Sequence, residues 1–179
     1  MRIIAGKAGG IRLKSIKGRE ARPTLDRVKE AIFNMIAYYI EDAEVLDLFS
    51  GFGSLGIEAL SRGAAHADLV EVNAKHIEII KENLKISNLE NKASLIQNDV
   101  FNYLESCSKS YDLIFMDPPY QENMTEKALN LIIENNILKK DGLIISERSS
   151  AEKNLEVDKL KIIKKRNYGN SLIDIYSFE

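Results

Sequence analysis

Short apolar runs alternate with longer amphipathic segments along most of this chain of 179 residues, and this alternation restricts the fold more than any other feature. The predicted strands and helices occupy, in order, residues 45–49, 54–62, 67–72, 74–87, 93–97, 101–106, 111–116, 125–136 and 142–147. Strands that alternate with helices pair in parallel, because each helix carries the chain back along the sheet. The pattern therefore predicts an α/β fold with a doubly wound, mostly parallel sheet, whose ligands bind beyond the carboxyl ends of the strands.

Further segments flank this alternation at both ends of the chain. Residues 160–166 and 172–178 are two more apolar runs, joined through Gly169 and its polar neighbours, and so short a connection predicts an antiparallel C-terminal hairpin. Residues 2–16 alternate polar and apolar side chains around a pair of glycines, which predicts an N-terminal β-hairpin with a glycine turn.

The N-terminal hairpin leads into a polar connector over residues 17–25. A helix is predicted to begin at Thr24, whose hydroxyl can cap it, and to end at about Tyr39. We therefore expect a basic hairpin with its connector in residues 1–23 and one larger domain in residues 24–179.

Apolar residues at helical spacing predict the core. They are Ile32, Phe33, Met35, Ile36, Ile77, Ile80, Leu84, Leu129 and Ile132. Tyr38 and Tyr39 are expected to cover the edge of this core, although either could contact a base. Asn34 lies near the apolar stripe, and its role is not predicted.

Cysteine and histidine are scarce. Cys107 is the one cysteine, which excludes an internal disulfide, and His66 and His76 are too few for a structural zinc site. No metal is therefore expected. No run approaches the roughly 18 apolar residues of a membrane span. We expect a soluble, cytoplasmic protein without a membrane partner.

Residues 45–56 are typical of a short strand, a glycine-rich turn and a helix that begins at about Ser54. Gly51, Gly53 and Gly56 form the pattern G-x-G-x-x-G. Glycine permits a tight turn and lets the backbone approach a ligand closely. The pattern predicts a ligand-binding loop at the end of the first strand.

Glu71 ends the next apolar run, 20 residues after Gly51, and Val72 follows it. A carboxylate at this place can accept hydrogen bonds from both hydroxyls of a ribose. The glycine pattern and Glu71 together predict an adenosine-binding site. They suit a dinucleotide as well as S-adenosylmethionine, so they do not decide the chemistry.

The apolar run 111–116 is followed directly by Asp117, Pro118, Pro119 and Tyr120. The exocyclic amine of a nucleobase is a poor nucleophile, because its lone pair is delocalised into the ring. A carboxylate and a backbone carbonyl that accept its N–H bonds would hold it and favour lone-pair density on nitrogen. The prolines lack an N–H, so neighbouring carbonyls can face a pocket, and the tyrosine offers a stacking face. The motif predicts chemistry on a planar amine, but by itself it suits an ordinary turn equally well.

Charge is distributed unevenly. Residues 1–29 hold nine basic and two acidic side chains, a local charge of +7, whereas the other 150 residues hold 16 basic and 25 acidic ones, a charge of -9. A basic end on an acidic body suits a polyanion such as RNA, although such charges can also simply be solvated. The candidate RNA-binding residues are Arg2, Lys7, Arg12, Lys14, Arg22 and Arg27.

The conjunction of an adenosine site with an amine-holding motif resembles the class I S-adenosylmethionine-dependent methyltransferases, which have a Rossmann-like fold. The chain is more closely similar to the RsmD-type family of 16S ribosomal RNA guanine-N2 methyltransferases. The similar segments are residues 1–7, 22–34, 45–64, 117–120 and 168–169. The Asp-Pro-Pro-Tyr motif is shared with DNA amino-methyltransferases, so the N-terminal segments are the specific part.

The resemblance implies S-adenosylmethionine as the cofactor and adds residues to its site. Asp99 would accept the adenine amino group, with Val100 and Phe101 against the ring, and it could also cap the helix that follows. Asp47 would lie near the methionine or ribose part, or it could brace the glycine loop. Arg27 could bind the methionyl carboxylate, pair with an acidic neighbour or reach the RNA.

The implied reaction is a direct in-line transfer in which a guanine N2 attacks the sulfonium methyl. Asp117 and the carbonyl near Pro118 would hold the amine while Tyr120 stacks on the base. Catalysis is then mostly positioning and desolvation, and no metal is required. The guanine must be unpaired or flipped from its stack. The resemblance implies 16S ribosomal RNA within an assembling small subunit as the partner, and a monomeric enzyme.

Two other functions remain compatible with the residues. A DNA adenine or cytosine amino-methyltransferase would use the same chemistry, but the chain has no additional block of about 100 residues that could recognise a DNA target. A non-catalytic RNA-binding assembly factor would not need the glycine, ribose-binding and amine-holding positions together.

Overall fold

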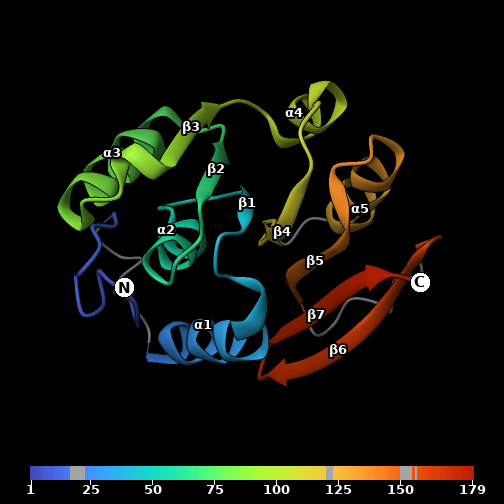
Figure 1. Cartoon of the computed structure of the whole chain (residues 1–179), viewed down its shortest axis with the longest axis horizontal. Helices are drawn as coiled ribbons and strands as arrows, with labels where there is room; N and C mark the ends of the chain where they lie inside the picture. Colours follow the sequence, from blue (N-terminus) through green and yellow to red (C-terminus); the bar gives the residue numbers. More distant parts are fainter. Residues whose placement is uncertain (17–22, 120–122, 150–154, 156) are drawn as a thin grey trace.

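The computed structural model describes residues 1–16, 23–119, 123–149, 155 and 157–179. In this part of the chain one sheet has the strand order β3-β2-β1-β4-β5-β7-β6 (Figure 1). Its strands are β1 (Glu44–Leu48), β2 (His66–Glu71), β3 (Ala93–Gln97), β4 (Tyr111–Met116), β5 (Leu138–Ser149), β6 (Leu160–Tyr168) and β7 (Ser171–Phe178). Strands β1 to β5 pair in parallel, and β7 runs antiparallel to both β5 and β6. The predicted doubly wound sheet and C-terminal hairpin are confirmed.

Helices cover both faces of the sheet. They are α1 (Pro23–Met35), α2 (Ser54–Ser61), α3 (Ala74–Ser87), α4 (Val100–Ser106) and α5 (Met124–Glu134), with 3-10 turns at Ala37–Tyr39 and Glu90–Lys92. Val45 packs in a core with α1, α2 and α3, whereas its neighbour Leu46 packs in a second core with α4 and α5. Both faces of the central strands are therefore buried, as a parallel sheet requires. None of the helices described here is long and apolar enough to cross a membrane.

The bounds of α1 and β5 differ most from the prediction. Helix α1 begins at Pro23, so Thr24 lies inside the helix and not at its N-cap position, and the regular helix ends at Met35. Proline suits the first helical position, because the N–H there has no partner within the helix. Strand β5 runs from Leu138 to Ser149, longer than the predicted 142–147, because Leu138 already pairs with Tyr111 of β4, before a shift in register that precedes the pair Leu143 and Leu113.

The predicted core residues are buried, except that Met35 is only partly so. The expectation that Tyr38 and Tyr39 cover the core is wrong, because Tyr38 is fully exposed and Tyr39 is 46% exposed. The tight 3-10 turn directs their neighbours Ile36 and Ile40 inward in their place. Asn34 is exposed too.

The N-terminal segment, residues 1–16, reverses direction as predicted, but its ladder is a single antiparallel bridge between Arg2 and Arg12. Backbone bonds also join the two arms, from the N–H of Ile3 to the carbonyl of Ile11 at 2.9 Å and from the N–H of Gly10 to the carbonyl of Ile3 at 2.8 Å. Other backbone N–H groups bond to α2. The N–H of Ile4, for example, donates to Glu58 Oε2 at 2.7 Å. The segment is therefore a short, irregular hairpin, in which some backbone donors join the two arms and others serve the contact with the helix.

The N-terminal segment is also part of the main core. Ile3, Ala8 and Leu13 are 0%, 4% and 7% exposed and belong to the core beneath α1 and α2. Gly6 packs so closely that a Cβ on it would overlap the carbonyl of Ser61. Residues 1–16 therefore pack into the core of the larger domain, and the division of the chain at residue 23 stays a prediction.

Replacing Ile3 by alanine should lower the free energy of unfolding by about 2–5 kcal/mol, because a fully buried isoleucine loses its packing and leaves a cavity. Chemical denaturation measures this change. The matched control is Ile16→Ala, whose side chain is 42% exposed and whose loss should cost less than about 0.5 kcal/mol. Equal, small effects at both positions would contradict an integrated N-terminal segment.

Candidate active site

The order of the strands reverses at β1, with β2 and β3 on one side and β4 and β5 on the other. A parallel sheet forms a crevice at such a switch, because the connections leave the two central strands in opposite directions. The glycine loop, residues 49–53, leaves β1 at this point, and residues 117–119 leave β4. Leu48 is paired with Met116, so both segments begin at the same level.

Three carboxylates stand on one face of the sheet at this switch. Asp47 pairs with Phe115, which packs in the core beneath α1 and α2. Asp117 and Glu147 extend two residues further along adjacent strands, and the alternation of side chains places them on the same face. Glu147 was not predicted as a site residue. Only the pairing of β4 with β5 identifies it as the neighbour of Asp117.

The glycines of the G-x-G-x-x-G pattern have different tasks. Gly51 and Gly53 adopt left-handed φ values of 56° and 78°. The nearest atom to a Cβ on Gly51 would be the Phe49 carbonyl oxygen at 3.9 Å, so space beside the loop is open to a ligand. A Cβ on Gly56 would lie only 3.1 Å from Asp47 Oδ2, so this glycine lets α2 approach the first strand.

Phe49 also has a left-handed backbone, with φ 59°. Such a conformation is strained for a bulky residue and is held only by its surroundings. Its ring lies edge-on to Phe101, with ring centroids 6.4 Å apart, and the ammonium of Lys127 lies 4.1 Å from the centre of the Phe101 ring. Sequence reasoning missed Phe49, because nothing in its neighbours signals a positive φ.

Glu71 connects the glycine loop to the end of β2. Its Oε2 accepts the N–H of Gly51 at 2.9 Å, and its Oε1 accepts the N–H of Asn73 at 2.8 Å. His76 Nδ1 lies 3.5 Å from the same Oε1. Val72, between these partners, is 64% exposed beside the loop. Glu71 is therefore held rigidly at the predicted ribose position.

Asp47 is 2% exposed, and its Oδ2 accepts the N–H of Gly56 at 2.8 Å. Burial raises its pKa to about 7; the hydrogen bond from Gly56 opposes this shift, and the charge of Glu71 adds to it. The bracing role of Asp47 is thus confirmed. A contact with the methionine or ribose part of a cofactor stays a prediction.

Asp117 follows β4 directly, and part of its side chain is exposed to solvent. Protein atoms nevertheless displace much of the water around its carboxylate. This burial, followed by the charges of Glu147 and then Asp47, raises the pKa of Asp117 to about 7. Pro118 is buried and Pro119 is exposed, while Tyr120 lies outside the described residues.

Asp99 caps α4, and its Oδ1 accepts the N–H groups of Phe101 at 2.9 Å and Asn102 at 3.2 Å. Its Oδ2 has no hydrogen bond to any residue in the described part of the chain. The side chain of Val100 is buried in the core on the α4 and α5 side, whereas Phe101 is half-buried. The cap is confirmed, and the contact with adenine stays a prediction.

The candidate RNA-binding side chains Arg2, Lys7, Arg12 and Lys14 are exposed on the N-terminal segment. Arg2 Nε lies 3.6 Å from Asp26, and Lys14 Nζ lies 3.1 Å from Glu82. Arg27 is exposed on α1, and Arg22 lies outside the described residues. Ion pairs at the surface contribute little, so a phosphate can displace their partners.

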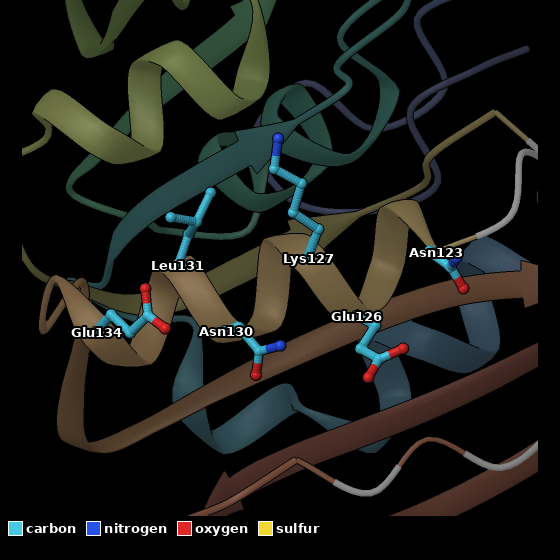
Figure 2. A pocket seen from close by; sticks show the side chains of 6 residues that line it. All are labelled: Asn123, Glu126, Lys127, Asn130, Leu131 and Glu134. Atoms are coloured by element: carbon cyan, nitrogen blue, oxygen red, sulfur yellow. The ribbon is translucent and has the colours of Figure 1, made fainter.

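Two grooves occur elsewhere on the described surface. One of about 400 Å³ is lined by Asn123, Glu126, Lys127, Asn130, Leu131 and Glu134. Figure 2 shows Lys127 and Leu131 on one side of α5, with Glu126 and Asn130 on the other. The second, of about 570 Å³, lies along the C-terminal hairpin. Neither of these two grooves contains the glycine loop or Asp117.

No group of three His, Cys, Asp or Glu side chains suited to a metal ion occurs among the described residues. Cys107 is half-buried at the end of α4, where its Sγ lies 3.5 Å from the Tyr103 hydroxyl. A thiol in this environment has no partner base to activate it.

Comparison with known proteins places this arrangement in a family. Residues 1–177 match the model of a family described as conserved hypothetical protein 95. The ribosomal RNA small subunit methyltransferase D of Haemophilus influenzae is 35% identical, over 94% of this chain and 89% of that protein. This chain belongs to the ribosomal RNA small subunit methyltransferase D family.

Other members of the family match over their full length. YlbH of Bacillus subtilis is 41% identical, over 98% of this chain and 98% of that protein. The solved structure of Escherichia coli yhhF has a TM-score of 0.91 at 32% identity, covering 100% of this chain and 98% of that one. The resemblance inferred from sequence is confirmed, and so is the fold that it implies.

Replacing Asp47 by asparagine should stabilise the ligand-free protein by about 1–3 kcal/mol at pH 8 and change little near pH 4. The folded pKa is about 7 against an ordinary value of 3.8. The folded state therefore keeps a proton that the unfolded chain releases, so stability falls as pH rises from about 4 to 7. Denaturation with urea across this range measures the effect.

The matched control is Asp141→Asn at an exposed position. It should leave the pH dependence of stability unchanged. A gain from Asp47→Asn that is the same at pH 4 and pH 8 would contradict a buried, proton-binding carboxyl.

Proposed function

We propose that this protein transfers the methyl group of S-adenosylmethionine to the exocyclic N2 amine of a guanine in 16S ribosomal RNA. Membership of the family makes the protein an S-adenosylmethionine-dependent ribosomal RNA methyltransferase. The guanine N2 position and the individual residue roles are the proposal. One observation carries it: Asp117 stands level with the glycine loop on the adjacent strand, so an amine held by Asp117 would lie beside a cofactor held by the loop.

The polar groups at the switch between β1 and β4 fit S-adenosylmethionine. A carboxylate has about four acceptor positions, and Glu71 uses two of them for backbone N–H groups, so two remain for ribose hydroxyls. Asp99 keeps Oδ2 for the adenine amino group. Gly51 leaves open space beside the loop. Asp47 and Asp117 supply negative charge where the sulfonium would lie.

When bound, S-adenosylmethionine supplies an electrophilic methyl group on a positively charged sulfur. Asp117 would accept a hydrogen bond from the guanine amine and direct the nitrogen lone pair toward that methyl, and the carbonyl near Pro118 would hold the second N–H. Tyr120 would stack on the base. After transfer the nitrogen carries an extra proton, which leaves to Asp117 or to water and restores the neutral amine.

The carboxylate cluster suits a cationic ligand. In the ligand-free protein the pKa values of Asp47 and Asp117 are raised to about 7, so both carboxyls are partly protonated at neutral pH. A sulfonium beside them favours the ionised form and lowers both pKa values. Binding of the cofactor would therefore produce the ionised Asp117 that can hold the amine.

The proposal also covers how the RNA substrate is bound in the cell. The exposed cations Arg2, Lys7, Arg12 and Lys14 would bind phosphates on either side of the target guanine, and Arg22 and Arg27 would extend this contact. We propose that the RNA is bound within an assembling small subunit in the cytoplasm, and that the enzyme acts as a monomer.

Transfer of labelled methyl from S-adenosylmethionine tests the function. Small subunits and deproteinised 16S RNA, both from a strain that lacks the gene, serve as acceptors. Digestion to nucleosides should yield labelled N2-methylguanosine at one position. Label in another nucleoside, or transfer to DNA in preference to RNA, would contradict the proposal.

Replacing Asp117 by alanine should lower kcat by about 100-fold or more, because the variant has no preorganised acceptor for the amine. The affinity for the neutral product S-adenosylhomocysteine should change by less than about threefold, since the hydrogen bonds to ribose and adenine remain. Single-turnover transfer and calorimetry measure the two effects. Asp141→Ala is the control, and near-normal turnover of Asp117→Ala would refute the mechanism.

Replacing both Lys7 and Arg12 by alanine should weaken binding to small subunits. The slope of log affinity against log salt should also become shallower, by about 0.7–0.9 for each phosphate that the variant no longer neutralises. Filter binding over a salt series measures the slope. The control replaces Lys81 and Lys85, which are exposed on α3. Identical slopes for both variants and the wild type would show that the N-terminal cations are only solvated.

A further inference from the structure

Asn83 of α3 holds the N-terminal segment and the glycine loop with a single buried side chain. It is 0% exposed. Its Oδ1 accepts the N–H of Lys14 at 2.7 Å, and its Nδ2 donates to the carbonyl oxygens of Lys14 at 3.1 Å and Phe52 at 3.0 Å. Phe52 lies between the two left-handed glycines of the loop. The amide thus bonds to both the N–H and the carbonyl of Lys14, as the backbone of a neighbouring strand would. It also fixes the position of the Phe52 carbonyl in the loop.

A second set of buried bonds joins the same two segments. Lys29 of α1 is 4% exposed, and its Nζ donates to the carbonyl oxygen of Arg2 at 2.5 Å and to Ser54 Oγ at 3.3 Å. Ser54 is the residue that begins α2 directly after the loop. Lys29 also pairs with Glu58, 3.2 Å away, which accepts the N–H of Ile4. Both ends of the loop are therefore connected to the N-terminal segment.

The residues held in this way are also the ones that present cations to solvent. Arg2 and Lys14 offer their backbone groups to Lys29 and Asn83, while their side chains are exposed. Their present partners, Asp26 and Glu82, form surface ion pairs that a phosphate can replace. A phosphate bound by these side chains would therefore lie next to the backbone that the buried groups hold.

The interactions continue from the loop to the predicted ribose site. The ring of Phe52 lies edge-on to His76, with ring centroids 4.9 Å apart, and His76 Nδ1 lies 3.5 Å from Glu71 Oε1. Glu71 in turn accepts the N–H of Gly51. A continuous series of contacts thus connects Lys14 with Glu71, the carboxylate at the predicted ribose position.

We propose that Asn83 is a positioning residue that couples RNA binding at the N-terminal segment to cofactor binding at the glycine loop. This inference rests on the proposed function. Because such coupling is reciprocal, bound RNA increases the affinity for the cofactor by the same factor as bound cofactor increases the affinity for RNA. The enzyme then assembles its complete site mainly when both ligands are present.

Asn83 is a better test of the coupling than Lys29. Removing Lys29 takes one of two cationic partners from the carboxylate of Glu58, which is 0% exposed and keeps only Arg62 among the described residues, and this endangers the fold. Leucine is close to asparagine in size and removes all three hydrogen bonds of the amide. Ser87→Ala is the matched control, since Ser87 is buried one turn further along α3 and its hydroxyl donates to the carbonyls of Asn83 and Leu84 in its own helix.

The experiment measures the affinity for S-adenosylhomocysteine, which binds without turnover, in the absence and presence of saturating small subunits from a strain that lacks the gene. The wild type and Ser87→Ala should bind it about fivefold or more tightly when subunits are present. For Asn83→Leu this ratio should fall below about twofold, even though each ligand still binds. A general loss of stability would weaken binding under both conditions and leave the ratio unchanged.

An unchanged ratio in Asn83→Leu would overturn the inference, as would a wild type that binds both ligands independently. A wild type that binds neither ligand would instead refute the proposed function. If the variant does not fold, amide hydrogen exchange of the wild type provides an independent test of the coupling. Subunits alone should slow exchange at the amides of residues 51–56, and unchanged exchange there would also overturn the coupling.

Discussion

The pairing of β1 with β4 is the constraint on which the rest of the site depends. Because Leu48 and Met116 are level, the glycine loop and Asp117 leave the sheet at the same height on neighbouring strands. A shift of one residue would turn Asp117 to the opposite face and separate it from the loop. The register is secured by burial on both faces, since Val45 and Leu113 fill one core while Leu46 and Ile114 fill the other.

This arrangement concentrates negative charge before any ligand is present. Asp47, Asp117 and Glu147 face the same side of three adjacent strands, and burial raises the pKa of the two aspartates to about 7. The charge of Glu71 adds to the shift of Asp47, and the charges of Glu147 and Asp47 add to that of Asp117. Such a site lowers the stability of the ligand-free protein, and a bound cation would remove this destabilisation. The strained backbone of Phe49 beside the same loop is a second cost of this kind.

The N-terminal segment connects the proposed RNA surface with the glycine loop through buried polar groups. Glu58 accepts N–H groups from Ile4 and Ala5, and Asn83 pairs with both backbone groups of Lys14. Buried polar groups of this kind are stable only when they are fully bonded, so they also fix the position of the segment. The cations of the segment therefore project from a rigid base and not from a free arm.

The sequence by itself determined the α/β class, nearly all the strands and helices, and the residues at the ends of β1, β2 and β4. It did so because strand and helix periodicities, glycine patterns and turn residues are local signals. It did not predict Glu147, which becomes a neighbour of Asp117 only when β5 pairs with β4. It also missed the roles of Asn83, Lys29 and Glu58, whose partners lie as many as 69 residues away. The tertiary structure decided these interactions, because a buried polar side chain is defined by the distant backbone groups that satisfy it, and no local pattern encodes which groups those are.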